Sequence, residues 1–272
     1  MKLAKFILPL LLLLFSGCSN VVSQSNYVPA GFVTIREIPL SFIPQKCLYS
    51  SSQKTTFVWQ KDSNLIHIFQ NGIKINSIGG MGTGQTNFNN LSDIALAPDG
   101  SLLALDSFAR KIKKFDTQGG FIAQFSLNNF DEPLLFDIAL DETFYIYDNR
   151  SREIVATSLY GQQEYYRFGN FQLKTPSNLI LSGNNLVVND RTNDQTLVFD
   201  SLGQFLFSRN GYFQFQNGQW FLLQPYFLES EKSAAHFCQS LEKWDSFILQ
   251  NGFCVVQSPQ KVLIGKIQYE IQ

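Results

Sequence analysis

The sequence predicts an all-β protein built from a four-stranded unit that repeats along the chain. Three observations indicate this fold class: the residue types, the tight turns and a constant spacing. Aromatic residues make up 14% of the chain and charged residues only 16%, which favours strands over long helices. Short apolar runs are separated by tight-turn signals such as Pro98-Asp99-Gly100. Strands of five to seven residues joined in this way predict antiparallel meanders.

The repeat is visible in three segments that begin at Leu91, Leu135 and Pro176. In each, an aspartate closes the second strand and a glycine lies in the turn before the fourth. These residues, each series spaced 42 residues apart, are Asp106, Asp148 and Asp190, and Gly119, Gly161 and Gly203. A meander of about 42 residues that repeats predicts the blades of a β-propeller.

The number of blades follows from the length of the chain. Residues 32–272 hold about six units of about 42 residues, so a six-bladed β-propeller of four-stranded antiparallel blades is expected. Residues 55–79 supply three strands of a blade before the clear repeats, and a degenerate fifth blade begins near Tyr212. The last blade has three strands from Asp245, and Phe32–Leu40 is expected to add its fourth. This closure joins the two ends of the chain and removes an open sheet edge.

The clearest repeat carries a family resemblance. Its sequence is GTGQTNFNNLSDIALAPDGSLLALDSFARKIKKFDTQGG, with strands expected at Asp93–Ala97, Ser101–Leu105, Lys111–Phe115 and Phe121–Phe125. It resembles the NHL repeat over Ile78–Phe125, and less closely as far as Gly211. It departs from the family pattern at Leu91, where proline is expected, and at Asp93, where glycine is common. The resemblance implies a six-bladed propeller.

The first seventeen residues are read as a targeting segment. Two lysines precede an apolar run, Phe6–Phe15, that is too short for a stable membrane span. The following FSGC resembles a bacterial lipobox, which implies a lipoprotein signal peptide at 1–17, lipidation of Cys18, a tether at 18–31 and the propeller at 32–272. Ser19 and the lack of acidic residues before Arg36 suggest the periplasmic face of the outer membrane. The alternative is an ordinary cleaved signal peptide.

Charge and cysteine content limit the function. The chain without its signal has 19 basic and 22 acidic residues, since two of the 21 basic residues lie in the signal. This balance argues against nucleic acid as a partner. Three further cysteines, Cys47, Cys238 and Cys254, are either small buried side chains or a disulfide pair with one left over, in any of three pairings.

A glycine cluster, Gly79 to Gly84, raises the question of a phosphate-binding loop. The dinucleotide pattern requires a third glycine where Gln85 stands, and no lysine follows before Lys111. The next apolar element is a strand, so no helix N-terminus is available for an anion. The cluster is therefore interpreted as a crossing between blades.

Two sets of acidic residues have different interpretations. The aspartates that end the second strands are expected to accept hydrogen bonds from the adjacent turn. Asp93, Asp137 and Asn178 are aligned at the start of the innermost strands, near one mouth of the channel. Their oxygen atoms are candidate calcium ligands, as in six-bladed lactonases of the gluconolactonase type. A solvated polar ring is the alternative.

Basic and aromatic residues suggest partner surfaces. Arg110, Arg150, Arg152 and Arg191 lie between the second and third strands of successive blades, so they share one face. They are candidates for an acidic protein or a glycan, with ordinary surface loops as the alternative. Trp220, Tyr226 and Phe227 form either a partner-binding patch or part of the core.

Catalytic patterns are scarce. The chain has two histidines, His67 and His236, and no Gly-x-Ser-x-Gly motif. The favoured function is a non-catalytic, lipid-anchored propeller of the cell envelope that binds a protein or glycan and needs no cofactor. The alternatives are a calcium-dependent hydrolase or lactonase at the channel mouth, and a structural subunit of an envelope assembly.

Overall fold

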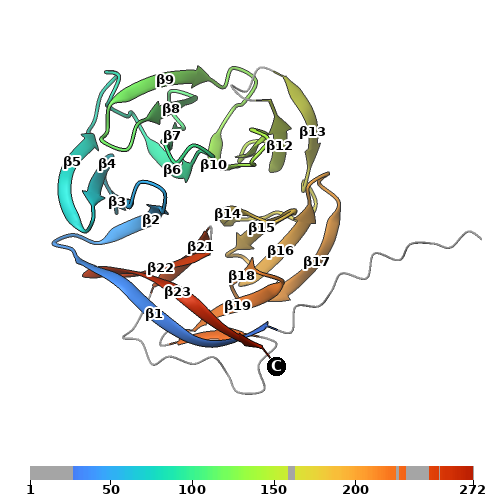
Figure 1. Cartoon of the computed structure of the whole chain (residues 1–272). Coiled ribbons are helices and arrows are strands. Elements are labelled where there is room, and N and C mark those ends of the chain that lie inside the picture. Colours follow the sequence, from blue (N-terminus) through green and yellow to red (C-terminus); the bar gives the residue numbers. More distant parts are fainter. Residues whose placement is uncertain (1–26, 159–162, 225–226, 231–244, 251, 272) are drawn as a thin grey trace, which may run out of the picture.

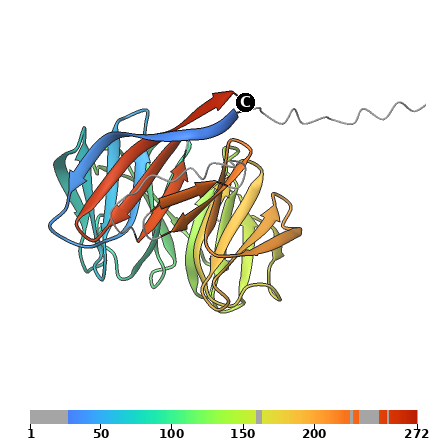
Figure 2. The same ribbon diagram turned by 90° about the horizontal axis from the view of Figure 1, so that it is seen from below.

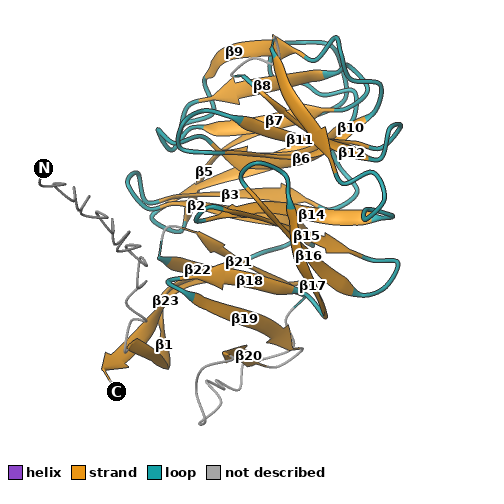
Figure 3. Ribbon diagram, turned by 90° about the vertical axis from the view of Figure 1, so that its right-hand side faces the viewer, coloured by secondary structure: helices purple, strands orange, loops and turns teal. Residues whose placement is uncertain are grey.

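The computed structural model is a ring of six β-sheets (Figure 1). It describes residues 27–158, 163–224, 227–230, 245–250 and 252–271. These residues form strands and turns, without any helix that could cross a membrane (Figure 3). The predicted six-bladed β-propeller is confirmed.

The first three blades are regular antiparallel meanders with the innermost strand first. Blade 1 consists of β2 (Pro44–Ser50), β3 (Thr55–Gln60), β4 (Leu65–Gln70) and β5 (Ile73–Gly79). Blade 2 consists of β6 (Leu91–Leu96), β7 (Leu102–Asp106), β8 (Lys111–Phe115) and β9 (Phe121–Ser126). Blade 3 consists of β10 (Pro133–Ile138), β11 (Phe144–Asp148), β12 (Glu153–Thr157) and β13 (Glu164–Phe168).

The last three blades complete the ring. Blade 4 consists of β14 (Pro176–Ser182), β15 (Asn185–Asp190), β16 (Gln195–Asp200) and β17 (Phe205–Asn210). The described part of blade 5 consists of β18 (Phe213–Gln216), β19 (Gln219–Gln224) and β20 (Phe227–Ser230). Blade 6 consists of β21 (Ser246–Gln250), β22 (Phe253–Ser258), β23 (Lys261–Ile271) and β1 (Tyr27–Pro39).

The two ends of the chain close the ring, as predicted. β1 pairs antiparallel with β23 from Tyr27–Ile271 to Pro39–Lys261, so the first and last strands lie side by side (Figure 2). β1 begins at Tyr27, five residues before the expected start at Phe32. The expected tether at 18–31 therefore ends earlier, because its last five residues are strand, while residues 1–26, including Cys18, lie outside the described residues. The inner strand β2 of blade 1 is an element that the sequence pattern did not reveal.

Burial of apolar side chains between blades holds the ring together. Six clusters of buried hydrophobic residues span the junctions between neighbouring blades, and the cluster between blades 1 and 2 also contains Ile180 of blade 4 and Ile248 of blade 6. Between blades 1 and 2, for example, Phe57 and Ile68 pack with Leu102 and Phe115. A strand of a propeller blade is covered on both faces, so its middle residues are buried without alternation, as in β7 and β11. The outermost strand β9 alternates because only one of its faces is covered.

The aspartates that recur every 42 residues hold the turns of each blade. Asp148 accepts hydrogen bonds from the backbone N–H groups of Asp131 (2.7 Å), Glu132 (3.2 Å) and Arg150 (2.9 Å). Asp106 and Asp190 make the corresponding bonds in blades 2 and 4. Each carboxylate thus joins its own turn to the loop that enters the blade, which is the predicted structural role.

The glycine cluster is the crossing from blade 1 to blade 2. Gly79 has a φ of 111°, and a Cβ atom there would lie 1.9 Å from the carbonyl oxygen of Asn64, so only glycine fits. The buried ammonium of Lys113 donates to the carbonyl oxygens of Gly84 (2.8 Å) and Asn87. A loop whose carbonyl groups surround a cation is not a phosphate cradle.

We expect Asp148→Ala to lower the free energy of unfolding by about 3 kcal/mol, because three backbone N–H groups lose their acceptor. Urea denaturation followed by tryptophan fluorescence would measure it. The control is Asp131→Ala, which removes an exposed carboxylate nearby and should change stability by less than about 0.5 kcal/mol. Equal losses in the two variants would contradict the assigned role.

Candidate functional site

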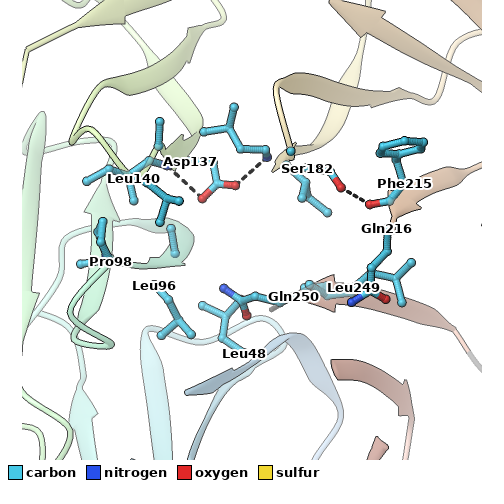
Figure 4. Close-up of a pocket in the computed structure, with 18 of the residues that line it drawn as sticks. Leu48, Leu96, Pro98, Asp137, Leu140, Ser182, Phe215, Gln216, Leu249 and Gln250 are labelled. Carbon is cyan, nitrogen blue, oxygen red and sulfur yellow. Dashed lines mark hydrogen bonds between the residues drawn. The ribbon is translucent and has the colours of Figure 1, made fainter. Parts of the chain in front are cut away.

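One end of the central channel opens into a pocket of about 900 Å³. Inner-strand residues of all six blades line it (Figure 4). At the mouth of the pocket, each blade contributes one lining residue at the point where its inner strand ends and its first turn begins. These mouth residues are Ser50, Ala97, Ala139, Ser182, Gln216 and Gln250. The mouth is therefore asymmetric, with small residues on blades 1–4 and two glutamines on blades 5 and 6.

The topology of the blades separates this pocket from the other end of the channel. Neighbouring strands of a blade are antiparallel, so the turns after the first and third strands lie at one end. The turns after the second strand lie at the opposite end. The pocket is lined by residues of the first turns, such as Pro98, Gly100 and Asn217, and we call this end the pocket end.

Polar side chains join every blade to the next around the channel. The junctions of blades 1 to 4 are, in order, Lys46 Nζ to Asp93 Oδ1 (2.7 Å), Phe136 N to Asp93 Oδ2 (3.0 Å) and Leu181 N to Asp137 Oδ2 (2.8 Å). Ser182 Oγ then donates to the Phe215 carbonyl of blade 5, and Gln214 bonds the Phe247 carbonyl (2.7 Å) and the Leu249 N–H (2.7 Å) of blade 6. Gln257 Nε2 donates to the Gln45 carbonyl of blade 1 (3.3 Å). We call this ring the polar girdle. It pairs backbone groups that the blades would otherwise leave without partners at the channel wall.

Asp93 is fully engaged in the polar girdle. It is 2% exposed, and one carboxylate oxygen accepts both the Lys46 ammonium and the N–H of Ile94 at 2.8 Å. The other oxygen binds the Phe136 N–H. A buried charge of this kind is tolerated because an opposite charge and backbone donors satisfy it.

Asp137 is engaged less completely. Its carboxylate accepts hydrogen bonds from Leu181 N–H and from Ile138 N–H (2.9 Å) (Figure 4), but the side chain is half-buried and lines the pocket. Burial raises the pKa of Asp137 to about 6, while its backbone hydrogen bonds and Lys46 oppose the rise and Asp93 adds to it. Asp137 therefore carries a carboxylate that another cation would stabilise.

The structure does not bring the three candidate calcium ligands to one level, which corrects the sequence alignment. The inner strands of blades 1–4 each contain a bulge, and the residues that directly follow it are Lys46, Asp93, Leu135 and Asn178. Asp137 lies two residues further toward the mouth. The first turns of blades 2 and 3 have the same length, since Leu96 pairs with Leu102 and Ile138 with Phe144. The repeated letters Asp-Ile-Ala-Leu align Asp137 with Asp93, but strand pairing makes Ala95 the equivalent of Asp137 in blade 2.

Two glutamines of the mouth were not among the site residues predicted from the sequence. The side-chain oxygen atoms of Gln216 and Gln250 are buried without a hydrogen-bond partner, and both residues line the pocket. Each precedes an Asn-Gly hairpin turn, in the repeated sequence Gln-Asn-Gly. The same three letters also begin at Gln70, between β4 and β5, so only the fold shows that the copies at Gln216 and Gln250 lie at the channel mouth.

The predicted basic residues lie away from the pocket. Arg110, Arg150, Arg152 and Arg191 are exposed on turns after the second strands, at the end opposite the pocket. The acidic residues Asp131, Glu132, Glu153 and Asp194 share that end. The surface is thus of mixed charge rather than a basic patch.

The predicted aromatic patch is partly core. Trp220 is 9% exposed and packs with Val187 and Val198 between blades 4 and 5, so it is not available to a partner. Phe227 begins β20, and Tyr226 lies outside the described residues.

The remaining candidates for chemistry are buried or structural. Cys47 and Cys254 are free thiols whose burial raises their pKa, and Cys238 lies outside the described residues. His67 lies in β4 between Ser77 Oγ (2.8 Å) and Gln60 Oε1 (3.0 Å), and burial followed by Lys74 lowers its pKa. His236 lies outside the described residues. Within the described ranges, no three His, Cys, Asp or Glu side chains are grouped to hold a metal ion.

Known structures share the fold. Virginiamycin B lyase from Staphylococcus aureus is 11% identical, with a TM-score of 0.59 over 87% of this chain and 100% of the lyase. A catalytically inactive histidine-to-alanine variant of that lyase, with quinupristin, is 10% identical, with a TM-score of 0.55 and the same coverage. The Cps50 (Swd1) propeller domain of Myceliophteria thermophila is 8% identical, with a TM-score of 0.52 over 87% of this chain and 100% of that domain.

At these identities the likeness concerns the fold. No protein-family model matches the chain, and no curated protein sequence is significantly similar to it.

The raised pKa of Asp137 gives stability a defined pH dependence. Because about 6 exceeds the reference value of 3.8, the contribution of Asp137 is fully present below about pH 4 and is lost as pH rises through about 6. Relative to Asp137→Asn, the wild type should lose about 2 kcal/mol between pH 4 and pH 7. Urea denaturation across that range would measure the difference, with Asp131→Asn as control. A constant difference would contradict the assignment.

Proposed function

We propose that this protein is a non-catalytic binding protein of the cell envelope that holds a partner protein at the pocket end of its propeller. One observation carries the proposal. Asp93 and Asp137, the channel carboxylates that were candidates for metal binding, form hydrogen bonds of the polar girdle. The pocket beside them is open and is lined by all six blades. Such a site suits recognition more than chemistry.

The lining of the pocket favours binding over hydrolysis. Its charged lining residues are Lys46, Asp137 and Asp141, and no histidine or cysteine is among the lining residues. A nucleophile activated by a base within hydrogen-bond reach is the usual requirement of a hydrolase, and the lining offers no such pair. Apolar residues such as Leu48, Leu96 and Ile248 form much of the wall.

The calcium-dependent hydrolase is the less favoured candidate. The Lys46 ammonium, 2.7 Å from Asp93 Oδ1, holds the position that a cation would need. Asn178 is not among the lining residues of the pocket. The three candidate ligands also belong to two levels of the channel wall, whereas calcium requires six to eight oxygen atoms around one point.

A protein partner fits better than a glycan. Sugar-binding sites commonly combine aromatic faces with many hydrogen-bonding groups, and the described aromatic lining consists of Tyr145 and Phe215. The rim bears exposed apolar side chains, with Leu140 88% and Leu202 68% exposed. Apolar residues around a pocket are typical of protein recognition.

Attachment to the envelope is proposed from the FSGC sequence at Cys18. Eight residues separate Cys18 from the first described residue of β1, so an anchor there would keep the propeller near the membrane surface. The wild-type protein is expected in the membrane fraction.

Affinity capture from solubilised envelope tests the binding function. The wild-type protein should retain a specific partner, and Ala139→Trp, which fills the mouth, should lose it. The double variant Arg150→Ala with Arg152→Ala, at the opposite end, should retain it. Cys18→Ser should move the protein to the soluble fraction without weakening capture. Recovery of the propeller alone in repeated experiments counts against the proposal.

A calcium titration tests the hydrolase. We expect no change in melting temperature up to millimolar calcium, and none with chelator, because Lys46 neutralises the only deeply buried channel carboxylate among the described residues. Binding to the folded state would raise the melting temperature by mass action. A rise that Asp93→Asn abolishes would favour the hydrolase instead.

A further inference from the structure

We infer that the pocket receives a short stretch of partner polypeptide that carries a lysine or arginine, with its cationic group at Asp137 and its main-chain amides at Gln216 and Gln250. The inference rests on the proposed function and names the chemistry of the segment that the mouth recognises. Three independent features of the pocket support it.

The first feature is the pair of unsatisfied glutamines. A buried carboxamide oxygen without a donor is destabilising, and a native protein tolerates it where the group has a further role. Gln216 and Gln250 occupy equivalent positions on adjacent blades, and both oxygen atoms lack a partner. A carboxamide offers a donor and an acceptor, as a peptide group does, so the two side chains can turn to pair with a peptide main chain.

The second feature is charge. Of the three charged lining residues, Lys46 is paired with Asp93 at 2.7 Å. Asp137 and Asp141 have no ion-pair partner in the described part of the chain, so the described lining has a net negative charge. The half-buried Asp137 keeps lone pairs that the two backbone N–H groups do not use. An ammonium or guanidinium group there would form a charge-assisted hydrogen bond in a partly desolvated site.

The third feature is shape. Ser50, Ala97, Ala139 and Ser182 are small, and they leave space on the side of the mouth that faces the glutamines. A segment held between the glutamines and this open side would place its neighbouring residues on the apolar rim at Leu140 and Leu202. An isolated small amine would leave that rim uncovered.

Isothermal titration calorimetry with blocked tripeptides tests the inference. The probe is acetyl-Leu-Lys-Leu-amide, compared with the same peptide carrying norleucine or glutamate at the centre. The lysine peptide should bind at least about tenfold more tightly than the norleucine peptide, and the glutamate peptide most weakly. Absence of binding by the lysine peptide at millimolar concentration would overturn the inference.

Substitution of Asp137 separates charge from shape. Asp137→Asn should weaken the lysine peptide about tenfold and leave the norleucine peptide unchanged, so the preference for lysine is lost. Asp131→Asn, at the opposite end of the same blade, should alter neither. Equal weakening of both peptides by Asp137→Asn would mean that the charge is not recognised.

Substitution of the glutamines gives effects of opposite sign on stability and binding. Gln216→Met and Gln250→Met remove an unpaired buried oxygen, so each should raise the melting temperature by roughly 2 °C and weaken every peptide. The control Thr56→Val also removes a buried unpaired oxygen, but in β3, and should stabilise without any effect on peptide binding. Glutamine variants that bind normally would contradict the assigned contact.

The outcomes distinguish this inference from the proposed function. Partner capture that Ala139→Trp abolishes, without any binding of the lysine peptide, would support the pocket as the binding site and overturn the peptide chemistry. Capture that survives Ala139→Trp would overturn the inference and the pocket as the binding site, and would leave a binding protein that uses another surface. Preferential binding of a glycan over all peptides would also overturn the inference.

Discussion

The polar girdle is the constraint on which the channel depends. Six blades contribute six inner strands, and each strand has backbone groups at the channel wall that its own sheet does not pair. Side chains from neighbouring blades pair with these groups at five junctions, through carboxylates, glutamines and a serine, and the sixth junction is the ion pair between Lys46 and Asp93. Apolar clusters between the blades supply most of the stabilisation, whereas the girdle fixes how each inner strand sits against the next.

The polar girdle gives the channel carboxylate Asp93 a structural role. Asp93 connects three successive blades because it binds Lys46 on one side and the Phe136 N–H on the other. Removing it would leave an ammonium and a backbone N–H unpaired in the wall, which is costly in a site of low dielectric constant. A residue with that structural role is poorly suited to change partners during a reaction.

The asymmetry of the mouth distinguishes one side of an otherwise repetitive ring. The glutamines of the mouth, Gln216 and Gln250, lie in blades 5 and 6, where the repeat is least regular, and their side-chain oxygen atoms are buried without hydrogen-bond partners in the described part of the chain. The buried polar groups of the polar girdle have hydrogen-bond partners, whereas these two glutamine oxygen atoms do not. Such a local exception is the pattern expected of a functional site. The same side chains are therefore expected to reduce stability and to provide recognition.

The propeller, the number of its blades and its closure by the chain ends can all be predicted from the amino-acid pattern. The reason is that the repeated aspartate and glycine series mark the turns of single blades. Asp148, for example, bonds the turn that follows it and the loop that enters its own blade. Only the tertiary structure decided which residues meet across blades. The alignment of Asp137 with Asp93 failed because the letters Asp-Ile-Ala-Leu lie two residues further along the inner strand in blade 3 than in blade 2, while strand pairing keeps the 42-residue spacing. Lys46 meets Asp93, and Gln216 and Gln250 line the same pocket, only when neighbouring blades pack against each other. Contacts between residues tens of positions apart depend on the packing of whole blades.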